Sequence, residues 1–375
     1  MPSVFVLIAL LIAYGSLYPF EFVTPGEIHL LPWLYTEIWI SRGDVLANIL
    51  LFVPYGFAVA FGEHRSTHRM WLLIAGTVLA VALQWLQQFT PERVPALYDA
   101  FFNLLGVMVG LVAGALVGNR RYRALVPGRF WRTAKTAEIL IAGCWLGYRL
   151  FPFVPSFDWG QIKDSLKPLL LHPDLSFASI LNNTAGWALF FLLLSPRFAK
   201  PSPALLALAP LTLLAEVLIV DNVLTVANLV GVVMATLLVL ATPARLQVRV
   251  MILVLLSSLL LNGVLPFALA PRLNDFSWIP LSAFFSGSLS LNIQSLLQKL
   301  FFYGGLVLML NRAGLELYPA SMAASLWIFL IECAQVFLRH HSPEITDPLI
   351  PLLVVFSIKL MSVRSTRWRT QSPPK

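Results

Sequence analysis

Long apolar runs alternate with short polar segments along the whole chain, and most runs end at Pro, Gly or a charged residue. A helix that crosses a membrane needs about 20 consecutive, mainly apolar residues. The pattern therefore predicts an all-α, polytopic membrane protein with about twelve transmembrane helices. The expected segments are 3–19, 45–62, 70–89, 100–118, 136–152, 177–195, 203–220, 223–242, 249–268, 293–311, 319–338 and 348–362.

The composition leads to the same class of protein. Of the 375 residues, 58% are hydrophobic and only 12% are charged, and the mean hydropathy is +0.79. A soluble domain would carry about 25% charged residues, and a disordered chain would be far less apolar. The first apolar segment has neither a basic start nor a small-residue cleavage site, so we expect it to be retained as a membrane anchor.

Positive charges divide the connecting segments into two sets. Most of the 26 Lys and Arg residues fall in alternate loops and in the C-terminal tail, whereas the other loops are mainly acidic. Cytoplasmic loops carry the excess of Lys and Arg, so we expect a multi-pass protein with both termini in the cytoplasm. The net charge of +8 then reflects topology, and no nucleic-acid partner is expected. The basic set is Arg65, Arg69, Arg120, Arg121, Arg123, Arg129, Arg132, Lys135, Arg197, Lys200, Arg245, Arg249, Arg312, Lys359, Arg364, Arg367, Arg369 and Lys375.

Three stretches of the chain share one arrangement of residues. Related tripeptides, 18–20, 151–153 and 265–267, each follow an apolar segment and contain Pro-Phe. One constant offset also relates polar residues near the start of the chain to residues near its end. The pairs include Gln84 with Glu332, Gln87 with Gln335, Arg93 with His341 and Asp99 with Asp347.

This self-similarity predicts three four-helix units, at 1–124, 125–246 and 247–375. The middle unit is the loosest copy, because the loop before its last helix is shorter. Each unit has an even number of expected spans. The units would therefore enter the membrane in the same direction, as parallel repeats.

Polar residues of the first unit are expected at one depth, near the outer membrane surface. They lie at the outer ends of three expected helices and in the loop that joins two of them, so their side chains are expected to face one pocket. An ionisable residue at membrane depth costs at least about 2.5–3.5 kcal/mol on insertion scales, which favours a function or a partner. The candidate ligand-binding residues of this unit are Asp44, Asn48, Gln84, Gln87, Arg93, Asp99 and Asn103.

The other two units keep parts of this set. In the middle unit Glu216 lies within an expected span, but the loop that would carry the arginine is missing. Structural roles remain open for all of these residues, because Asp at the start of a helix caps free amide groups, and buried polar side chains join neighbouring helices. The candidates of the last unit are Glu332, Gln335, His341 and Asp347, with Lys299 close by.

Motifs for a nucleotide, a cofactor or a metal are missing from the sequence. The chain has no Walker loop, no glycine-rich dinucleotide fingerprint and no His-Glu-x-x-His pattern. Its two cysteines, Cys144 and Cys333, lie within expected spans, where they are interpreted as small packing residues. The pair His340 and His341 is of a kind more often solvated than bound to metal. We therefore expect no cofactor and no metal site.

The first unit resembles a known family in four motifs. They are the exit segment Tyr18-Pro19-Phe20-Glu21-Phe22, Asp44-x-x-x-Asn48-x-x-x-Phe52-x-Pro54-x-Gly56, Gln84-x-x-Gln87, and Arg93-x5-Asp99-x3-Asn103-x-x-Gly106. With them the unit is similar to the VanZ-like family of four-helix membrane proteins, named after an accessory factor for resistance to the glycopeptide teicoplanin. The family commonly has Glu-x-x-Gln on its third helix, which Glu332 and Gln335 restore in the last unit. The resemblance implies a bacterial inner-membrane protein of the cell envelope, connected with antibiotic resistance.

Three functions remain open at this point. The first is binding or movement of a membrane lipid or lipid-linked saccharide at the outer leaflet, with Arg93 on a phosphate or sugar-acid oxygen. The second is an integral-membrane enzyme that modifies such a substrate by acid–base chemistry of paired carboxyl groups and His341. The third is a scaffold for membrane-protein partners in envelope assembly. We favour the first, because ionisable residues within a membrane commonly mark sites.

Overall fold

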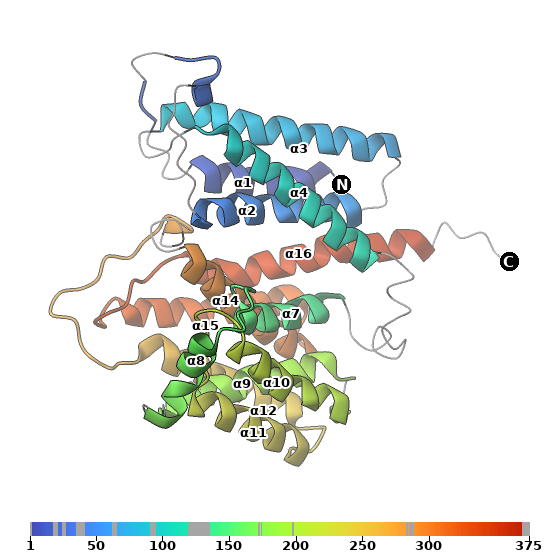
Figure 1. The fold of residues 1–375 in the computed structure, drawn as a ribbon. Helices are drawn as coiled ribbons and strands as arrows, with labels where there is room; N and C mark the ends of the chain where they lie inside the picture. The colour runs from blue at the N-terminus through green and yellow to red at the C-terminus, as the bar shows by residue number, and fades with distance from the viewer. Residues whose placement is uncertain are drawn as a thin grey trace. The chain divides into compact units, whose positions relative to one another are not determined.

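The computed structural model is a bundle of α-helices, as the sequence predicts (Figure 1). Thirteen α-helices occur in the part of the chain that it describes, and no named strand occurs there. The described residues are 2–17, 22–24, 28–34, 42–61, 66–90, 95–118, 136–171, 173, 175–196, 199–282, 284 and 289–369.

Each of the twelve expected apolar segments coincides with a helix. The twelve helices are α1 (Pro2–Leu17), α2 (Arg42–Phe61), α3 (Ser66–Leu86), α4 (Leu97–Gly118), α7 (Thr136–Leu150), α9 (Phe177–Leu194), α10 (Pro203–Val217), α11 (Val226–Ala241), α12 (Gln247–Val264), α14 (Leu289–Arg312), α15 (Leu317–Gln335) and α16 (Thr346–Arg369). Six helices of the described chain are long and apolar enough to cross a membrane, and three shorter ones are also apolar. The chain is therefore a multi-pass helical membrane protein, and the number of twelve spans stays a prediction.

Helix α8 (Trp159–Leu171) lies in a segment that the sequence suggested was a loop. It is short and has polar residues on one side. There Gln161 Nε2 donates to the Ile219 carbonyl at 3.0 Å and Ser165 Oγ donates to the Asn222 carbonyl at 2.7 Å. A search for long apolar runs passes over such a helix, because polar residues alternate with its apolar ones and no long apolar run results.

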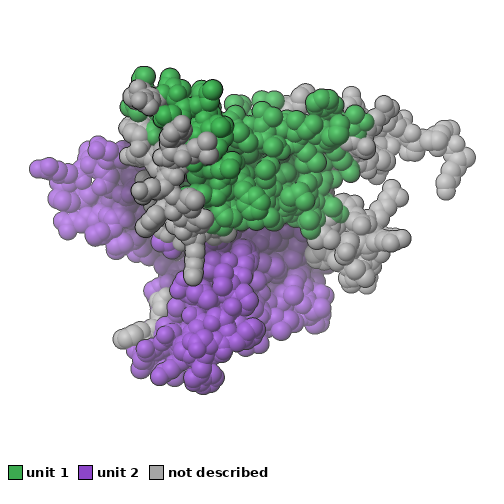
Figure 2. Space-filling view, turned by 45° about the horizontal axis from the view of Figure 1, so that its top comes forward, with its two compact units in different colours: residues 1–128, 284–289 green, residues 129–283, 290–375 purple. Residues whose placement is uncertain are grey.

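The chain forms two compact units (Figure 2). Unit 1 comprises residues 1–128 and 284–289, and unit 2 comprises residues 129–283 and 290–375. Unit 2 thus contains most of both the middle and the last predicted repeats. The division into three four-helix units stays a prediction.

In unit 1, α2 and α4 pack against each other along most of their length. Glycines form this seam: a Cβ atom added at Gly56 would overlap the Val107 carbonyl, and one added at Gly106 would overlap the Ile49 carbonyl. Gly110 and Gly114 continue the seam at four-residue spacing. Small residues at this spacing let the backbones of two membrane helices approach closely. Their contact positions the start of α4, where Asp99 and Asn103 lie.

Helix α9 forms the centre of unit 2 and packs against α7, α10, α11 and α12. All of its residues from 183 to 194 are buried, which agrees with a segment that is apolar on every side. Aromatic rings fill the space around it. Trp145 of α7 stacks on Phe301 of α14 with ring centroids 4.9 Å apart. This packed core leaves the ends of α12, α14, α15 and α16 to carry the polar residues described below.

One backbone contact occurs three times along the chain. In each case the segment that follows the first helix of a predicted unit hydrogen-bonds to the segment that follows its third helix. These pairs of helices are α1 and α3, α7 and α10, and α12 and α15. The bonds are Val23 N to Phe89 O at 2.7 Å, Val220 N to Val154 O at 3.0 Å and Arg339 N to Ala268 O at 2.8 Å.

Candidate functional site

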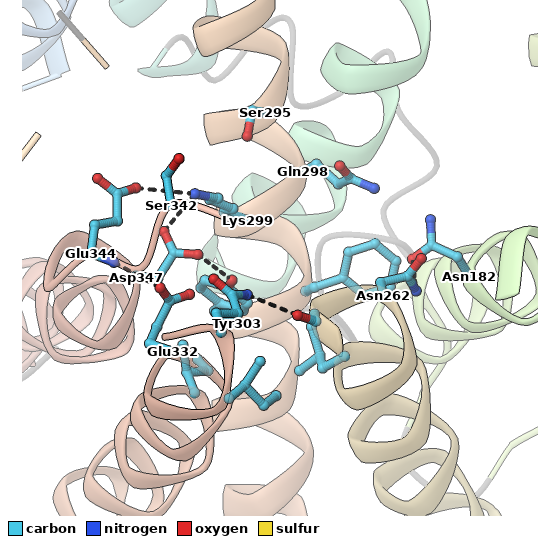
Figure 3. A pocket seen from close by; sticks show the side chains of 16 residues that line it. Asn182, Asn262, Ser295, Gln298, Lys299, Tyr303, Glu332, Ser342, Glu344 and Asp347 are labelled. Atoms are coloured by element: carbon cyan, nitrogen blue, oxygen red, sulfur yellow. Dashed lines mark hydrogen bonds and ion pairs between the residues drawn. The ribbon is translucent and has the colours of Figure 1, made fainter. Parts of the chain in front are cut away.

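Unit 2 contains a cavity of about 270 Å³ that is lined by residues of five helices (Figure 3). The middle of α14, the ends of α12, α15 and α16, the first turns of α9 and the segment before α16 all contribute to its wall. Apolar side chains, among them Leu259, Phe302 and Ile328, line part of it. The polar and ionisable residues that line it are Asn182, Asn262, Ser295, Gln298, Lys299, Tyr303, Glu332, Gln335, Ser342, Glu344 and Asp347.

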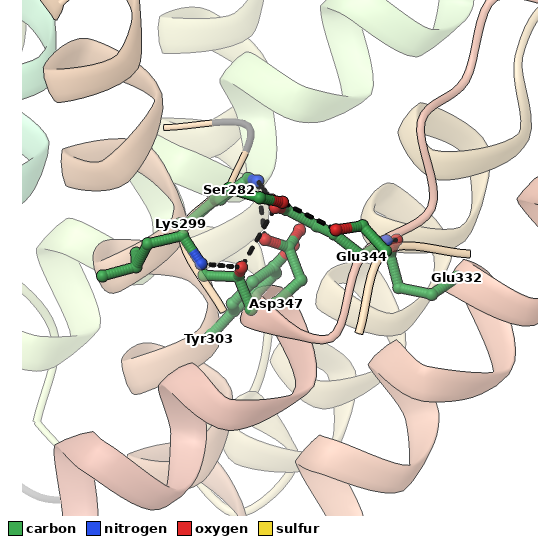
Figure 4. Close-up of polar contacts among 9 residues, drawn as sticks. Ser282, Lys299, Tyr303, Glu332, Glu344 and Asp347 are labelled. Carbon is green, nitrogen blue, oxygen red and sulfur yellow. Dashed lines mark hydrogen bonds and ion pairs between the residues drawn. The ribbon is translucent and has the colours of Figure 1, made fainter. Parts of the chain in front are cut away.

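Lys299 and Asp347 form the central ion pair of this cavity (Figure 4). Lys299 Nζ lies 2.6 Å from Asp347 Oδ1 and 3.4 Å from Glu344 Oε1. The second oxygen of Asp347 accepts a hydrogen bond from the Tyr303 hydroxyl at 2.7 Å. Lys299 and Tyr303 are one turn apart on α14, so one face of this helix supplies both partners of the carboxylate.

Glu332 lies on α15 and is 4% exposed. Its Oε2 accepts a hydrogen bond from the backbone N–H of Glu344 at 2.8 Å, which ties the segment before α16 to α15. Gln335, one turn further along, donates through Nε2 to the Gly263 carbonyl at the end of α12, at 3.0 Å. These two side chains thus connect three elements of the cavity wall, and both also line the cavity.

Replacing Lys299 with Met is expected to lower the free energy of unfolding by about 2 kcal/mol, because buried Asp347 and Glu344 lose a charged donor. Unfolding of the purified protein in detergent measures this difference. Lys163→Met is the matched control, since Lys163 is exposed on α8 and surface substitutions usually change stability by less than about 0.5 kcal/mol. Equal stability of the two variants would show that the Lys299 ion pairs do not stabilise the cavity.

The candidates of the last unit are gathered in part. Glu332, Gln335 and Asp347 line the cavity, but His341 does not. His341 is half-buried in the segment before α16, and its Nε2 has no hydrogen-bond partner in the described chain. His341, the titrating partner that the acid–base hypothesis adds to Glu332 and Asp347, therefore does not lie among the residues that line this cavity.

In unit 1 the two glutamines make structural hydrogen bonds. Gln84 Oε1 accepts from the backbone N–H of Ala96 at 3.2 Å, and Gln87 Nε2 donates to the Ser16 carbonyl at 3.1 Å. Helix α3 of the first predicted unit corresponds to α15 of the last. Gln84 on α3 therefore makes the same kind of contact as Glu332 on α15: each side chain accepts a hydrogen bond from the segment before the next helix. Both glutamines are buried, and their hydrogen bonds position the end of α1 and the start of α4.

The other candidates of unit 1 are described to different extents. Asn48 is half-buried on α2, and Asp99 is half-buried in the first turn of α4. Asn103 is 1% exposed, and neither atom of its amide has a hydrogen-bond partner in the described chain. Arg93 lies outside the described residues, and the side chain of Asp44 is also outside them. The pocket expected around Arg93 therefore stays a prediction.

Glu216 is paired within the protein. Arg149 donates to both of its carboxylate oxygens, at 2.6 and 2.7 Å, and donates to Asn183 Oδ1 at 3.0 Å. Arg149 and Glu216 are both buried. Two parallel bonds of this kind satisfy a carboxylate well. This arrangement joins α7, α9 and α10.

Three ionisable residues that line the cavity, Lys299, Tyr303 and Glu344, are not among the binding residues expected from the sequence. A Lys and a Tyr one turn apart in an apolar helix are themselves a signal, because charged residues in such helices usually face a partner or a cavity. Glu344 offered no signal beyond its position in a loop that is acidic and is expected on the outer side. In the described part of the chain, no group of three or more His, Cys, Asp and Glu residues is arranged to hold a metal ion.

Comparison with known proteins supports the assignment of the N-terminal unit. Residues 5–118 match the model of the VanZ/LLP1 family. No curated protein and no solved structure gave a significant match to the chain. The matched segment contains α1 to α4, the glycine seam and all seven candidate residues of the first unit. Residues 5–118 are therefore a VanZ-like unit, as their motifs indicate.

Proposed function

We propose that this protein binds the polar headgroup of a membrane lipid or a lipid-linked saccharide in the cavity around Glu332 and Asp347. The observation that carries the proposal is the convergence of amide, hydroxyl and carboxyl groups from five helices on one cavity of about 270 Å³. Such groups offer both donors and acceptors to sugar hydroxyls and headgroups. Leu259, Phe302 and Ile328 offer apolar contacts beside them for the attached carbon chain.

The outer leaflet of the bacterial inner membrane is the place that we propose for this binding. Glu332 and Gln335 lie at the C-terminal end of α15, and Asp347 lies at the N-terminal end of α16. The excess of Lys and Arg in alternate loops assigns these helix ends to the outer side. Resemblance of the first unit to VanZ-like proteins of the cell envelope makes a lipid-linked envelope intermediate the ligand class that we infer, with a link to antibiotic resistance.

The VanZ-like unit offers a second place for the same class of ligand. Buried Asn103, whose amide has no hydrogen-bond partner in the described chain, supports a polar ligand near the start of α4. Arg93, with its planar guanidinium, is the proposed partner of a phosphate or sugar-acid oxygen. Asp44, Asn48 and Asp99 would complete that site.

Binding is favoured over catalysis by the contacts of Asp347. Both of its oxygens already accept hydrogen bonds, from Lys299 and from Tyr303. A general base needs an oxygen within reach of the substrate proton. Asp347 is better placed to orient Lys299 and Tyr303 than to take up a proton from a substrate.

Filling the cavity tests this function. Ser295 of α14 lines the cavity, so Ser295→Trp is expected to occupy the space with an indole ring and to reduce the amount of co-purified lipid about tenfold or more. Native mass spectrometry of protein extracted in mild detergent measures bound lipid per protein. Ser357→Trp is the matched control, because Ser357 is exposed on α16 and does not line the cavity.

Two results would contradict the proposal. One is a folded Ser295→Trp variant that retains as much lipid as Ser357→Trp. The other is a change in protein abundance without any change in bound lipid, which is the result expected of a scaffold whose polar residues only join helices. The unfolding temperature of each variant separates loss of lipid from loss of fold.

A further inference from the structure

The charges that line the cavity do not balance. Among its described lining residues, three are acids and one, Lys299, is a cation. Lys299 contacts Asp347 and Glu344, at 2.6 and 3.4 Å. No cation in the described chain lies within ion-pair distance of Glu332. One carboxyl group of the cavity is therefore left without a positive partner.

Glu332 is nevertheless as buried as a core residue. It is 4% exposed, and a buried carboxylate is costly unless it is both paired and hydrogen-bonded. Its Oε2 accepts the N–H of Glu344, whereas nothing in the described chain donates to Oε1. Figure 3 shows the carboxyl group of Glu332 directed toward Asp347 and Tyr303, at the wall of the cavity. Oε1 is therefore open to a donor that enters the cavity.

A further acceptor, the amide oxygen of Gln335, lies on the same helix and lines the same cavity. Gln335 is one turn along α15, and its Nε2 is already bound to the Gly263 carbonyl. Nothing in the described chain donates to its amide oxygen, and Gln335 lines the same cavity. A ligand group with several N–H donors and one positive charge can donate to the Glu332 carboxyl group and to the Gln335 amide oxygen at the same time.

We propose that the cavity binds a primary ammonium group of the headgroup, with Glu332 as its charge partner and Gln335 as a second acceptor. This inference rests on the proposed headgroup-binding function and names the chemistry of the ligand. An ammonium offers three N–H donors and one positive charge, which a quaternary ammonium, a glycerol or a sugar hydroxyl does not combine. Ethanolamine headgroups and amino sugars share this group.

The test compares lipids that differ only at the headgroup. Protein in detergent is titrated with phosphatidylethanolamine, phosphatidylcholine or phosphatidylglycerol, and native mass spectrometry measures the bound fraction. We expect phosphatidylethanolamine to be preferred about tenfold or more, because only its ammonium makes charge-assisted hydrogen bonds with Glu332. The preference is expected to disappear in Glu332→Gln.

The fold of Glu332→Gln is expected to persist. An amide oxygen still accepts the N–H of Glu344, and Gln84 shows that a glutamine makes this contact, with the N–H of Ala96. Glu316→Gln is the matched control: it removes the same charge from the opposite end of α15, where Glu316 is exposed. This control is expected to keep the preference.

A parallel titration with glucosamine distinguishes the two sources of the ammonium. If glucosamine competes with lipid for the cavity and this competition depends on Glu332, an amino sugar is supported as the ligand. If glucosamine does not compete but phosphatidylethanolamine is preferred, a lipid headgroup is supported. If all three lipids bind equally and Ser295→Trp abolishes their binding, the ammonium inference is overturned, whereas the proposed headgroup binding stands. Lipid binding that Ser295→Trp leaves unchanged would overturn both. A Glu332-dependent stabilisation by sodium or potassium ions alone, without any lipid preference, would also overturn the inference, because the missing partner would then be an inorganic cation.

Discussion

Replacing Arg149 with Met is expected to lower the free energy of unfolding by about 3–5 kcal/mol, because it leaves the carboxylate of Glu216 buried without a cation. Arg149 donates to both oxygens of Glu216 and to Asn183. Arg149 and Glu216 are 8% and 3% exposed, so water cannot replace the lost donors. Unfolding in detergent, followed by tryptophan fluorescence, measures the loss, since Trp145 packs beneath the guanidinium group.

Two variants separate the buried charge from the loss of a large side chain. Arg149→Met combined with Glu216→Met removes both charges, and most of the stability is expected to return, because replacing a buried ion pair by apolar residues is often neutral. Arg245→Met removes an exposed arginine of unit 2 and is expected to change stability by less than about 0.5 kcal/mol. A double variant as unstable as Arg149→Met would mean that packing, not charge, dominates at this place.

The helices follow from the sequence more completely than the site does. Each expected apolar segment is a helix because a long, mainly apolar segment in lipid has to satisfy its backbone hydrogen bonds within itself. Helix α8 does not follow, since its pattern is short and half polar. The exact ends also differ by a few residues, as in α12, which begins at Gln247 and ends at Val264.

The cavity is only partly foreseeable, for a reason that its residues show. Glu332, Gln335 and Asp347 stand at positions related by one offset to Gln84, Gln87 and Asp99, so comparison between repeats identifies them. By the same offset, Lys299 stands opposite Leu51 and Glu344 opposite Ala96. These residues are particular to the last unit. A comparison that searches for shared residues therefore misses the central ion pair.

Tyr303 illustrates a second limit of such comparisons. The offset relates it to Tyr55, whose hydroxyl donates to the Leu72 carbonyl at 2.7 Å. In the last unit the equivalent hydroxyl donates instead to Asp347. The residue type is the same, but its partner depends on whether an acceptor on a neighbouring helix lies within reach. Only the three-dimensional structure shows which acceptor lies within reach.

The polar residues on three helices differ in how fully the protein satisfies them. Gln84 accepts a hydrogen bond from the segment before α4, and Glu216 forms an ion pair with Arg149. Glu332 accepts a hydrogen bond from the segment before α16 in the same way as Gln84, but it is a carboxyl group with no cation of the described chain within ion-pair distance. Neutral or fully paired groups of this kind join helices. An ionisable group that is only half satisfied and lines a cavity is the one expected to bind a ligand, which is why the main proposed site lies in unit 2.

Replacing Gly106 with Ala is expected to destabilise the VanZ-like unit by about 3 kcal/mol, at the upper end of the usual cost of overpacking. The added Cβ atom would overlap the Ile49 carbonyl. Because the Cβ atom is fixed rigidly to the α4 backbone and the carbonyl is part of the α2 backbone, the two helices would have to separate along the glycine seam. Gly143→Ala is the matched control: nothing lies within 4 Å of its Cβ position on α7, and alanine is the better helix former by about 1 kcal/mol. Unfolding temperatures in detergent are therefore expected to fall for Gly106→Ala and to stay level or rise for Gly143→Ala. Equal temperatures for the two variants would mean that the close approach of α2 and α4 does not stabilise this unit.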